Sequence, residues 1–288
     1  MKFVLSTSFS TVAHLTELAP VADDTGWEAM SFSDHVANPE TLNTPYPYTD
    51  DGERRWQPFT DWPDPLVMVG ALATITKRLR FTNNIFVLPM RNPFLVAKAI
   101  GTAAVVSNNR LTLAVGVGWS KDEFQLLQQD FHTRGKRTDE MVEILRLLWS
   151  GEMVEYHGQH YDFNRLEMNP APSAQVPIWF GGISEAAMRR AARIGDGWVT
   201  DLQSSDVIID SIKKIQTWRK EYGRDHLPFE VMATPNDAYT TDAYKKLEDH
   251  GVTHILTQPW PFYHGDTQDL EKKKDGIKRY ADDVIGRM

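Results

Sequence analysis

The chain has 288 residues and carries 31 Lys and Arg against 39 Asp and Glu, which gives a formal net charge of −8. This acidic balance argues against binding to nucleic acid or to an anionic membrane, because those partners require clustered Lys and Arg. The sequence contains no cysteine, so disulfides, thiolate nucleophiles and Cys-ligated metals are excluded. The first residues do not resemble a secretion signal, and no apolar stretch approaches the roughly 20 residues of a membrane span. We therefore expect a cytoplasmic protein.

Strand-like and helix-like segments alternate through the first half of the chain. Lys2–Ser6 is β-prone, and Val12–Thr25 has apolar residues at helical spacing. Further strands are expected at Glu28–Ser33, Leu79–Leu88 and Leu111–Gly116, and helices at Pro65–Ile75, Pro93–Val106 and Thr138–Trp149.

The same alternation continues to the end. The expected strands are Ile178–Gly181, Gly197–Thr200, Phe229–Ala233 and Val252–Thr257, and the expected helices are Ser184–Ile194, Ser205–Tyr222, Thr241–His250 and Leu270–Ile285. Eight β-α units predict an α/β protein with the (β/α)8 TIM-barrel architecture, formed by residues 1–288 as a single domain. The main rival is an open doubly wound sheet, which needs a glycine-rich first turn to bind a dinucleotide. The turn at Thr7–Ser10 has no glycine.

Two insertions interrupt the alternation. Val36–Asp64 is rich in proline and aromatic residues and follows the second strand, which places it at the C-terminal, catalytic face of a barrel. A long loop there is expected to shape a substrate pocket, although it could instead cap the barrel or contact another subunit. The other insertion, Glu152–Val176, contains a pattern typical of a β-hairpin.

Ser33-Asp34-His35 lies at the C-terminal end of the second strand. Histidine can donate or accept a proton near neutral pH, and a neighbouring carboxylate can fix its tautomer or bind a ligand. The alternative is a histidine that only makes hydrogen bonds within a loop. Its place at the catalytic rim makes a functional role as plausible as that alternative.

Two further segments combine polar residues or glycines with strand ends. Asn83 and Asn84 interrupt an apolar strand, so they lie either at a bulge or against a polar ligand. Gly116-Val117-Gly118-Trp119 follows a strand and precedes a helix opened by Asp122-Glu123-Phe124. Glycines let the backbone approach a ligand, and a helix N-terminus attracts anions.

Gly181-Gly182-Ile183-Ser184 joins a strand to a helix for which Ser184 is the expected N-cap. Backbone N–H groups and a hydroxyl can converge there on a phosphate, but an ordinary tight turn has the same sequence pattern. The chain has no H-E-x-x-H, G-x-S-x-G or Walker sequence, which disfavours metal-dependent hydrolysis and a serine triad. A metal-dependent hydrolase that uses Asp34 and His35 would lack enough ligands.

Six motifs in order resemble those of the bacterial luciferase-like family, and most closely its coenzyme F420-dependent branch. They are Ser33-Asp34-His35, Val87-Leu88-Pro89 with Arg91-Asn92-Pro93, Gly116-Val117-Gly118-Trp119 with Glu123-Phe124, Arg134-Gly135-x-Arg137-Thr138-Asp139-Glu140, Pro177-Ile178-Trp179-x-Gly181-Gly182, and Arg190-Ala191-Ala192-Arg193-x-Gly195-Asp196-Gly197-Trp198. Beyond Trp198 the chain follows the family only in its β-α alternation.

The resemblance implies a barrel that holds F420 or FMN at its C-terminal mouth and transfers hydride at the central ring. It places His35 and Asp34 beside the reactive ring, with His35 as the proton donor or acceptor. It also implies a non-proline cis peptide at Asn84–Ile85 that supports the ring. The remaining cofactor contacts it implies are Gly181, Gly182, Ile183, Ser184 and Arg137 around the phosphate, and Gly116, Gly118, Trp119 and Asp122 along the cofactor's side chain.

The chain departs from the family pattern at Trp119, where some F420-dependent sugar-phosphate dehydrogenases carry a glutamate acid. This departure disfavours a sugar-phosphate substrate. Aromatic residues at the rim favour a flat or apolar substrate instead. The candidate substrate contacts are Tyr48, Trp56, Trp260 and His264.

The sequence thus predicts an F420-dependent oxidoreductase that transfers hydride to or from a small organic, apolar or aromatic substrate. The alternatives are an FMN-dependent monooxygenase of the same family, which uses reduced FMN and O₂, and a carrier or sensor that binds flavin or F420 without turnover. A homodimer is compatible with the resemblance.

Overall fold

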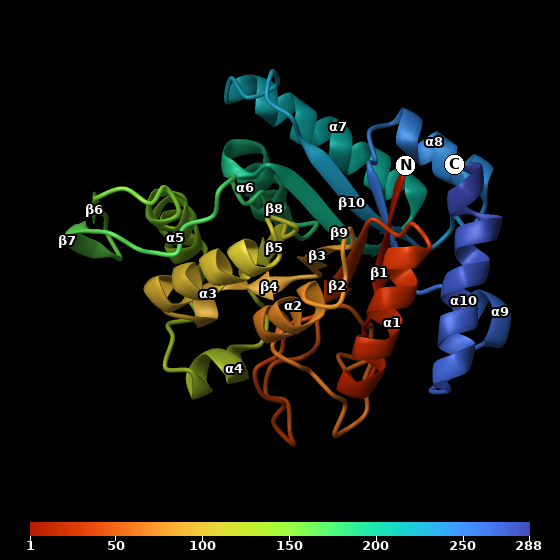
Figure 1. Ribbon diagram of the computed structural model, residues 1–288. Helices are drawn as coiled ribbons and strands as arrows, with labels where there is room; N and C mark the ends of the chain where they lie inside the picture. Colours follow the sequence, from red (N-terminus) through yellow and green to blue (C-terminus); the bar gives the residue numbers. More distant parts are fainter.

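Parallel strands form the inner wall and helices the outer layer of the computed structural model, which describes residues 1–288 (Figure 1). The barrel strands are β1 (Lys2–Ser6), β2 (Ala29–Phe32), β3 (Arg80–Asn83), β4 (Phe86–Val87), β5 (Leu113–Gly116), β8 (Ile178–Gly181), β9 (Gly197–Gln203), β10 (Glu230–Pro235) and β11 (His254–Thr257). Their order is β3-β2-β1-β11-β10-β9-β8-β5-β4. A parallel bridge between Phe81 and Leu111 joins the two ends of the sheet. The expected α/β barrel is confirmed.

Helices follow the strands as expected. They are α1 (Val12–Asp24), α2 (Pro65–Ala73), α3 (Pro93–Val106), α4 (Lys121–Leu126), α5 (Arg134–Leu148), α6 (Glu185–Ile194), α7 (Ser205–Glu221), α8 (Thr241–Asp249), α9 (Pro261–His264) and α10 (Leu270–Asp283), with 3-10 turns at Leu88–Met90 and Ile285–Arg287. Two of them begin in the same way: Asp64 and Asn92 cap α2 and α3, and a proline occupies the first helical position of each. No helix combines the length and apolar character that crossing a membrane requires.

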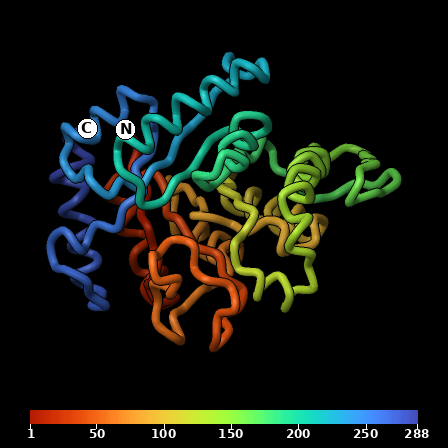
Figure 2. The backbone as a smooth tube through the Cα atoms, turned by 180° about the vertical axis from the view of Figure 1, so that it is seen from behind, coloured from red at the N-terminus to blue at the C-terminus, as the bar shows by residue number.

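Both insertions lie where their sequence suggested. The predicted hairpin is formed by β6 (Val154–His157) and β7 (Asp162–Leu166), which project beside α5 on one flank in Figures 1 and 2. The insertion after β2 contains no helix or strand between residues 33 and 64, and it forms the long loops at the lower edge of both views.

The expected single strand Leu79–Leu88 is divided into β3 and β4, which is a correction to the sequence-based prediction. The division falls at a cis peptide between Asn84 and Ile85, at the bond implied by the family resemblance. β3 pairs with β2, whereas β4 pairs with β5. Since β3 and β4 are two parts of one interrupted strand, the ring has the eight-membered pattern that the sequence predicts.

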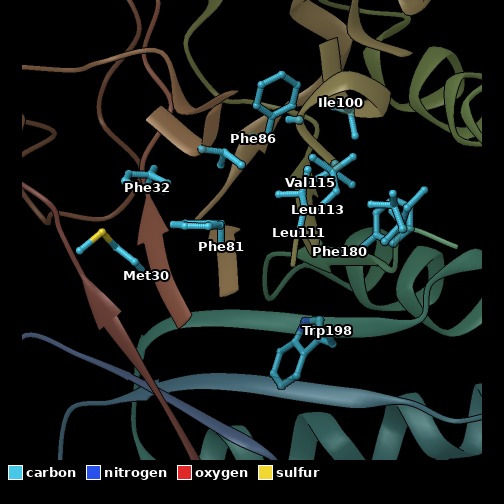
Figure 3. Close-up of a cluster of buried hydrophobic side chains, with 14 of the residues drawn as sticks. Met30, Phe32, Phe81, Phe86, Ile100, Leu111, Leu113, Val115, Phe180 and Trp198 are labelled. Atoms are coloured by element: carbon cyan, nitrogen blue, oxygen red, sulfur yellow. The ribbon is translucent and has the colours of Figure 1, made fainter. Parts of the chain in front are cut away.

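Alternation along the strands separates two apolar layers. Odd positions of β1, Phe3 and Leu5, face the helices and belong to the large core, part of which is drawn in Figure 3. Val4 belongs to a second cluster inside the barrel, together with Ala29, Ala114, Trp179, Val199, Met232 and Leu256. The barrel interior below the mouth is therefore filled with side chains and is not a pore.

Gly197 makes room for the largest side chain of this inner cluster. A Cβ at Gly197 would lie 2.4 Å from Cδ1 of Trp179 and 2.7 Å from the backbone oxygen of Glu230. The backbone oxygen cannot move without disturbing the pairing of β9 with β10. Close packing at this point depends on the absence of a side chain.

We expect Gly197→Ala to lower the free energy of unfolding by about 1–3 kcal/mol, because the added methyl overpacks the barrel interior. Denaturant unfolding followed by circular dichroism measures the change. Gly70→Ala is the matched control, since a Cβ at Gly70 in α2 meets nothing within 4 Å and alanine favours a helix. Equal stabilities of the two variants would contradict this account of the packing.

Candidate active site

A cavity of about 750 Å³ opens at the carboxyl ends of the barrel strands, the face on which barrel enzymes carry their active sites. Its walls come from the strand ends and from the insertion between β2 and α2. Twelve of the residues predicted from the sequence line it: Asp34, His35, Tyr48, Trp56, Asn84, Ile85, Gly118, Trp119, Gly181, Gly182, Ile183 and Ser184.

His35 is held by a buried carboxylate. Its Nδ1 lies 3.0 Å from Oε2 of Glu123, and Oε1 of Glu123 accepts hydrogen bonds from the amides of Val36 at 2.8 Å and Ala37 at 3.4 Å. A carboxylate can only accept, so Nδ1 carries the proton and Nε2 is left without a partner in the protein. The histidine therefore presents one defined ring nitrogen for chemistry in the cavity.

The environment of Glu123 favours its ionised form. Burial alone would raise the pKa of Glu123, but the hydrogen bond and charge of His35, together with the Val36 and Ala37 amides, lower that pKa below its usual value. The side chain of Glu123 is only 4% exposed. A buried carboxylate with three donors fixes both the tautomer of His35 and the start of the inserted loop.

Indole rings surround the imidazole. The ring centroid of His35 lies 4.8 Å from that of Trp56, 4.9 Å from that of Trp62 and 6.1 Å from that of Trp119. Trp56 is itself anchored, because its Nε1 donates a hydrogen bond of 3.2 Å to the side chain of Asn38. The insertion thus covers His35 with apolar, aromatic surface.

Asp34 lines the cavity but has both carboxylate oxygens engaged. The guanidinium of Arg91 donates to Oδ1 and Oδ2 at 2.7 Å each, and the amide of Val87 donates to Oδ2 at 2.8 Å. Through these hydrogen bonds, Asp34 ties the end of β2 to β4 and to Arg91. A free acid or base at this position would need one of these partners to leave.

Ile85 forms a wedge in the wall where the third strand is interrupted. A Cβ at Gly116 would lie 1.8 Å from Cδ1 of Ile85, and a Cβ at Gly181 would lie 2.6 Å from its Cγ2. These two glycines on β5 and β8 accommodate the isoleucine side chain. Gly116 does not line the cavity itself, because Ile85 covers it.

The β8–α6 turn supplies backbone to the rim. Gly182 has φ +117°, a conformation that disfavours other residues, and its carbonyl accepts a hydrogen bond of 2.8 Å from Nε1 of Trp198. Ser184 caps α6 by accepting from the amide of Ala187. The amides of Glu185 and Ala186, in the first turn of α6, have no carbonyl of the helix to bond and remain available to an anion.

Four other predicted residues lie outside the cavity lining. Asp122 accepts hydrogen bonds from Asn43 and Thr44 in the inserted loop, which lower its pKa. Trp260 is 1% exposed and packs in the core.

The remaining two also have partners within the fold. Arg137 is buried, and its guanidinium donates to the carbonyls of Pro89 and Asp130 and to the side chain of Gln129. His264 pairs with Asp275, with 2.7 Å between Nε2 and Oδ2. Arg137 and His264 therefore stabilise the fold around the cavity and do not line it. No three metal-ligating side chains converge anywhere in the structure.

The structure adds cavity residues that the site prediction did not include. Glu123 belongs to a quoted motif but was not assigned to the site, and only the fold brings it to His35. Asp201, Thr234 and Gln258 also line the cavity. Their signal in the sequence is weak, namely a polar residue at the carboxyl end of a barrel strand.

Sequence comparison matches the chain over residues 3–283 to the family described as luciferase-like monooxygenase. An uncharacterized protein of Mycobacterium tuberculosis strain H37Rv is 36% identical over 290 residues, which cover 100% of both chains. An F420-dependent glucose-6-phosphate dehydrogenase of Nakamurella multipartita is 29% identical over 191 residues, covering 65% of this chain and 52% of that protein. The resemblance seen in the six motifs is confirmed, and with it the expected class of luciferase-like oxidoreductase.

Solved structures share the fold at low sequence identity. An F420-dependent secondary alcohol dehydrogenase in complex with an F420-acetone adduct has a TM-score of 0.77 at 16% identity, covering 100% of this chain and 99% of that one. The oxygenating constituent of 3,6-diketocamphane monooxygenase of Pseudomonas putida, in complex with FMN, has a TM-score of 0.60 at 18% identity, covering 87% and 71%. Both support the luciferase-like barrel.

We expect Glu123→Gln to lower the free energy of unfolding by about 1–3 kcal/mol at neutral pH, because the buried charge that three donors share is lost. The pKa of Glu123 is lower in the folded chain than the roughly 4.3 of an unfolded one. The ionised carboxylate therefore contributes its full stability above about pH 4.3, the pKa of an unfolded glutamate. This contribution is lost as the pH falls from there through the lower pKa of the folded chain. Denaturant unfolding of wild type and variant at neutral pH and at about pH 3.5 should give a smaller difference in the free energy of unfolding at the lower pH.

Glu167→Gln, at an exposed residue, is the control. A difference that does not change with pH would refute the role of the charge.

Proposed function

The chain belongs to the luciferase-like monooxygenase family, and we propose that it is an F420-dependent oxidoreductase that exchanges hydride with a small, largely apolar organic substrate. The observation that carries this proposal is the imidazole of His35, which lines the cavity with Nδ1 held by Glu123 and Nε2 free. Hydride transfer to or from a carbon centre is accompanied by a proton. A histidine oriented by a buried carboxylate is suited to donate or accept it.

The residues at the mouth fit a flat ring with an anionic side chain. Ile85 and the backbone at Asn84 would support a ring from one side, and Gly118 and Trp119 line the same cavity. Gly182 lines the cavity, and a Cβ there would lie only 3.1 Å from that of Ala187, so the turn is compact where α6 begins. Ser184 and the first-turn amides of α6 would hold a phosphate there. When bound, the deazaflavin supplies or accepts the hydride.

The protein side of the reaction is divided among neighbouring groups. His35 would move the proton at Nε2, and Glu123 would stabilise the imidazolium formed when His35 gains one. Trp56 and Trp62 exclude water from the imidazole and offer an apolar surface to substrate. Asp34 would act by holding Arg91 and Val87, and thereby the strand that carries Ile85.

Charge in the cavity disfavours a phosphorylated substrate. Its lining contains three carboxylates, those of Asp34, Glu123 and Asp201, but no lysine and one arginine, Arg55. The guanidinium of Arg55 already donates a 2.8 Å hydrogen bond to the carbonyl of Tyr48. Away from the start of α6, where the phosphate of the cofactor would lie, a site for a phosphate dianion would require more free positive charge. This supports a neutral organic substrate that contacts Tyr48 and Trp56.

We expect the purified protein to bind F420 at least about tenfold more tightly than FMN. A paired titration, followed by absorbance and by quenching of the cavity tryptophans, measures both affinities. A preference for FMN, with oxygen uptake when reduced FMN and a substrate are present, would replace the proposal by an FMN-dependent monooxygenase. Binding of neither cofactor would refute both activities. Binding of F420 without turnover of any ketone, alcohol or enone in a broad panel would favour a carrier or sensor.

We expect His35→Ala to lower kcat by about 10²- to 10⁴-fold while cofactor affinity is retained, because the variant loses the proton carrier but none of the phosphate contacts. Steady-state kinetics and the same titration separate the two effects. His226→Ala is the matched control, because His226 is exposed and does not line the cavity. Unchanged turnover of the His35 variant would remove this residue from the mechanism.

A further inference from the structure

A ring of residues forms the floor of the cavity, one layer above the inner apolar cluster. Side chains two residues apart on a strand face the same way, so the residues two positions beyond Val4, Val199, Met232 and Leu256 also face inward. These residues are Ser6, Asp201, Thr234 and Gln258, and all four line the cavity. The floor is therefore polar on this side of the barrel, and Asp201 is its one charged member.

The carboxylate of Asp201 is poorly satisfied by the protein. Its only side-chain ion pair is a 3.5 Å contact between Oδ2 and Nη1 of Arg55, whose shorter hydrogen bond goes to the Tyr48 carbonyl. The side-chain amide of Asn84 is the one other donor near the carboxylate, and 37% of the Asp201 side chain is open. Asp34 and Glu123, the other two carboxylates of the cavity, each accept three or more hydrogen bonds. Asp201 thus differs from them in having capacity to accept further hydrogen bonds.

A second unsatisfied group lies on the adjacent strand. The hydroxyl of Thr234 on β10 is shielded from solvent and has no hydrogen-bond partner. β9 and β10 pair regularly up to Ala233 opposite Thr200, and the register then shifts before Pro235 pairs with Gln203. Asp201 and Thr234 are the residues that directly follow the last regular pair, so they lie on adjacent strands at the cavity floor. Burial raises the pKa of Asp201, while Arg55 and the Asn84 amide oppose that shift. Polar groups in such surroundings gain from a ligand that hydrogen-bonds to them.

We propose that Asp201 determines substrate specificity by accepting a hydrogen bond from a hydroxyl or ammonium group of the substrate. The inference rests on the proposed function, which it deepens by naming the substrate class: neutral or cationic molecules with an apolar body and a hydrogen-bond donor. Tyr48, Trp56 and Trp62 contact the apolar body, and the negative charge of Asp201 disfavours carboxylates and phosphates.

The test uses three probes with one ring and different head groups: cyclohexylammonium, cyclohexanol and cyclohexanecarboxylate. Their binding to the full-length protein without cofactor is followed by quenching of the cavity tryptophans. We expect the wild type to bind them in that order of decreasing affinity. Asp201→Asn should weaken cyclohexylammonium by at least about tenfold and strengthen cyclohexanecarboxylate, because only the charge is removed. Glu40→Gln is the control, because Glu40 is an exposed charge in the insertion between β2 and α2 and does not line the cavity, and it should leave all three affinities unchanged.

A second variant keeps the inference testable if Asp201→Asn is unstable. Asp201→Ala removes the carboxylate without leaving an unpaired polar group, and it should likewise weaken cyclohexylammonium by at least about tenfold. Affinities for all three probes that are the same in both variants as in the wild type would overturn the proposal. An equal loss for all three probes would also overturn it, because Asp201 would then serve only to hold Arg55 and the insertion.

The assay separates this inference from the proposed function because it contains no cofactor. A probe order that depends on Asp201 in a protein that binds neither F420 nor FMN would refute the proposed activity and leave the specificity assignment standing. Tight F420 binding, together with probe affinities that do not depend on Asp201, would support the proposed cofactor and refute the specificity assignment.

Discussion

The buried carboxylate of Glu123 is the group on which the geometry of the site depends. It accepts hydrogen bonds from Nδ1 of His35 and from the amides of Val36 and Ala37, so it fixes a side chain and the beginning of the inserted loop together. Asp122, the preceding residue of α4, holds the same loop through Asn43 and Thr44. A loop without helix or strand gains its shape here from charge-assisted hydrogen bonds to one short helix. The indole rings that the loop carries then enclose the imidazole.

Periodicity explains why the fold could be predicted. The β-prone run Lys2–Ser6 and the helical spacing of apolar residues in Val12–Thr25 are properties of local sequence, and eight alternating units allow few topologies. The division of the third strand is different. Pairing changes from β2 to β5 at Asn84, and the wedge of Ile85 needs Gly116 and Gly181 from two other strands. Local patterns contain no information on such distant partners. The two consecutive asparagines indicated a bulge as one of two alternatives, and the family resemblance indicated the cis peptide at Asn84–Ile85.

The lining of the cavity was predictable where a residue's position at a strand end or helix start decides it, and less so where a side chain can bond to several partners. His35, Gly182 and Ser184 line the cavity because they sit at strand ends or at a helix start. Asp122 and Arg137 have residue types that suit a ligand equally well, but their hydrogen bonds go to the protein. The choice depends on tertiary neighbours that lie far away in the sequence. The residue type alone does not distinguish an arginine or aspartate that binds a cofactor from one that holds a loop in position.

The contrast among the three cavity carboxylates connects the fold to selectivity. Asp34 and Glu123 are 1% and 4% exposed, and both are surrounded by donors, which lets them position neighbouring groups without competing for a ligand. Asp201 lies on the opposite part of the ring, where the floor is polar and donors are few. A carboxylate whose hydrogen-bond donors come from the protein stabilises the fold. A carboxylate that lacks such donors favours a ligand that can donate a hydrogen bond to it. The carboxylates on β2 and α4 therefore hold neighbouring groups in position, whereas the proposed role of the carboxylate on β9 is to select among substrates.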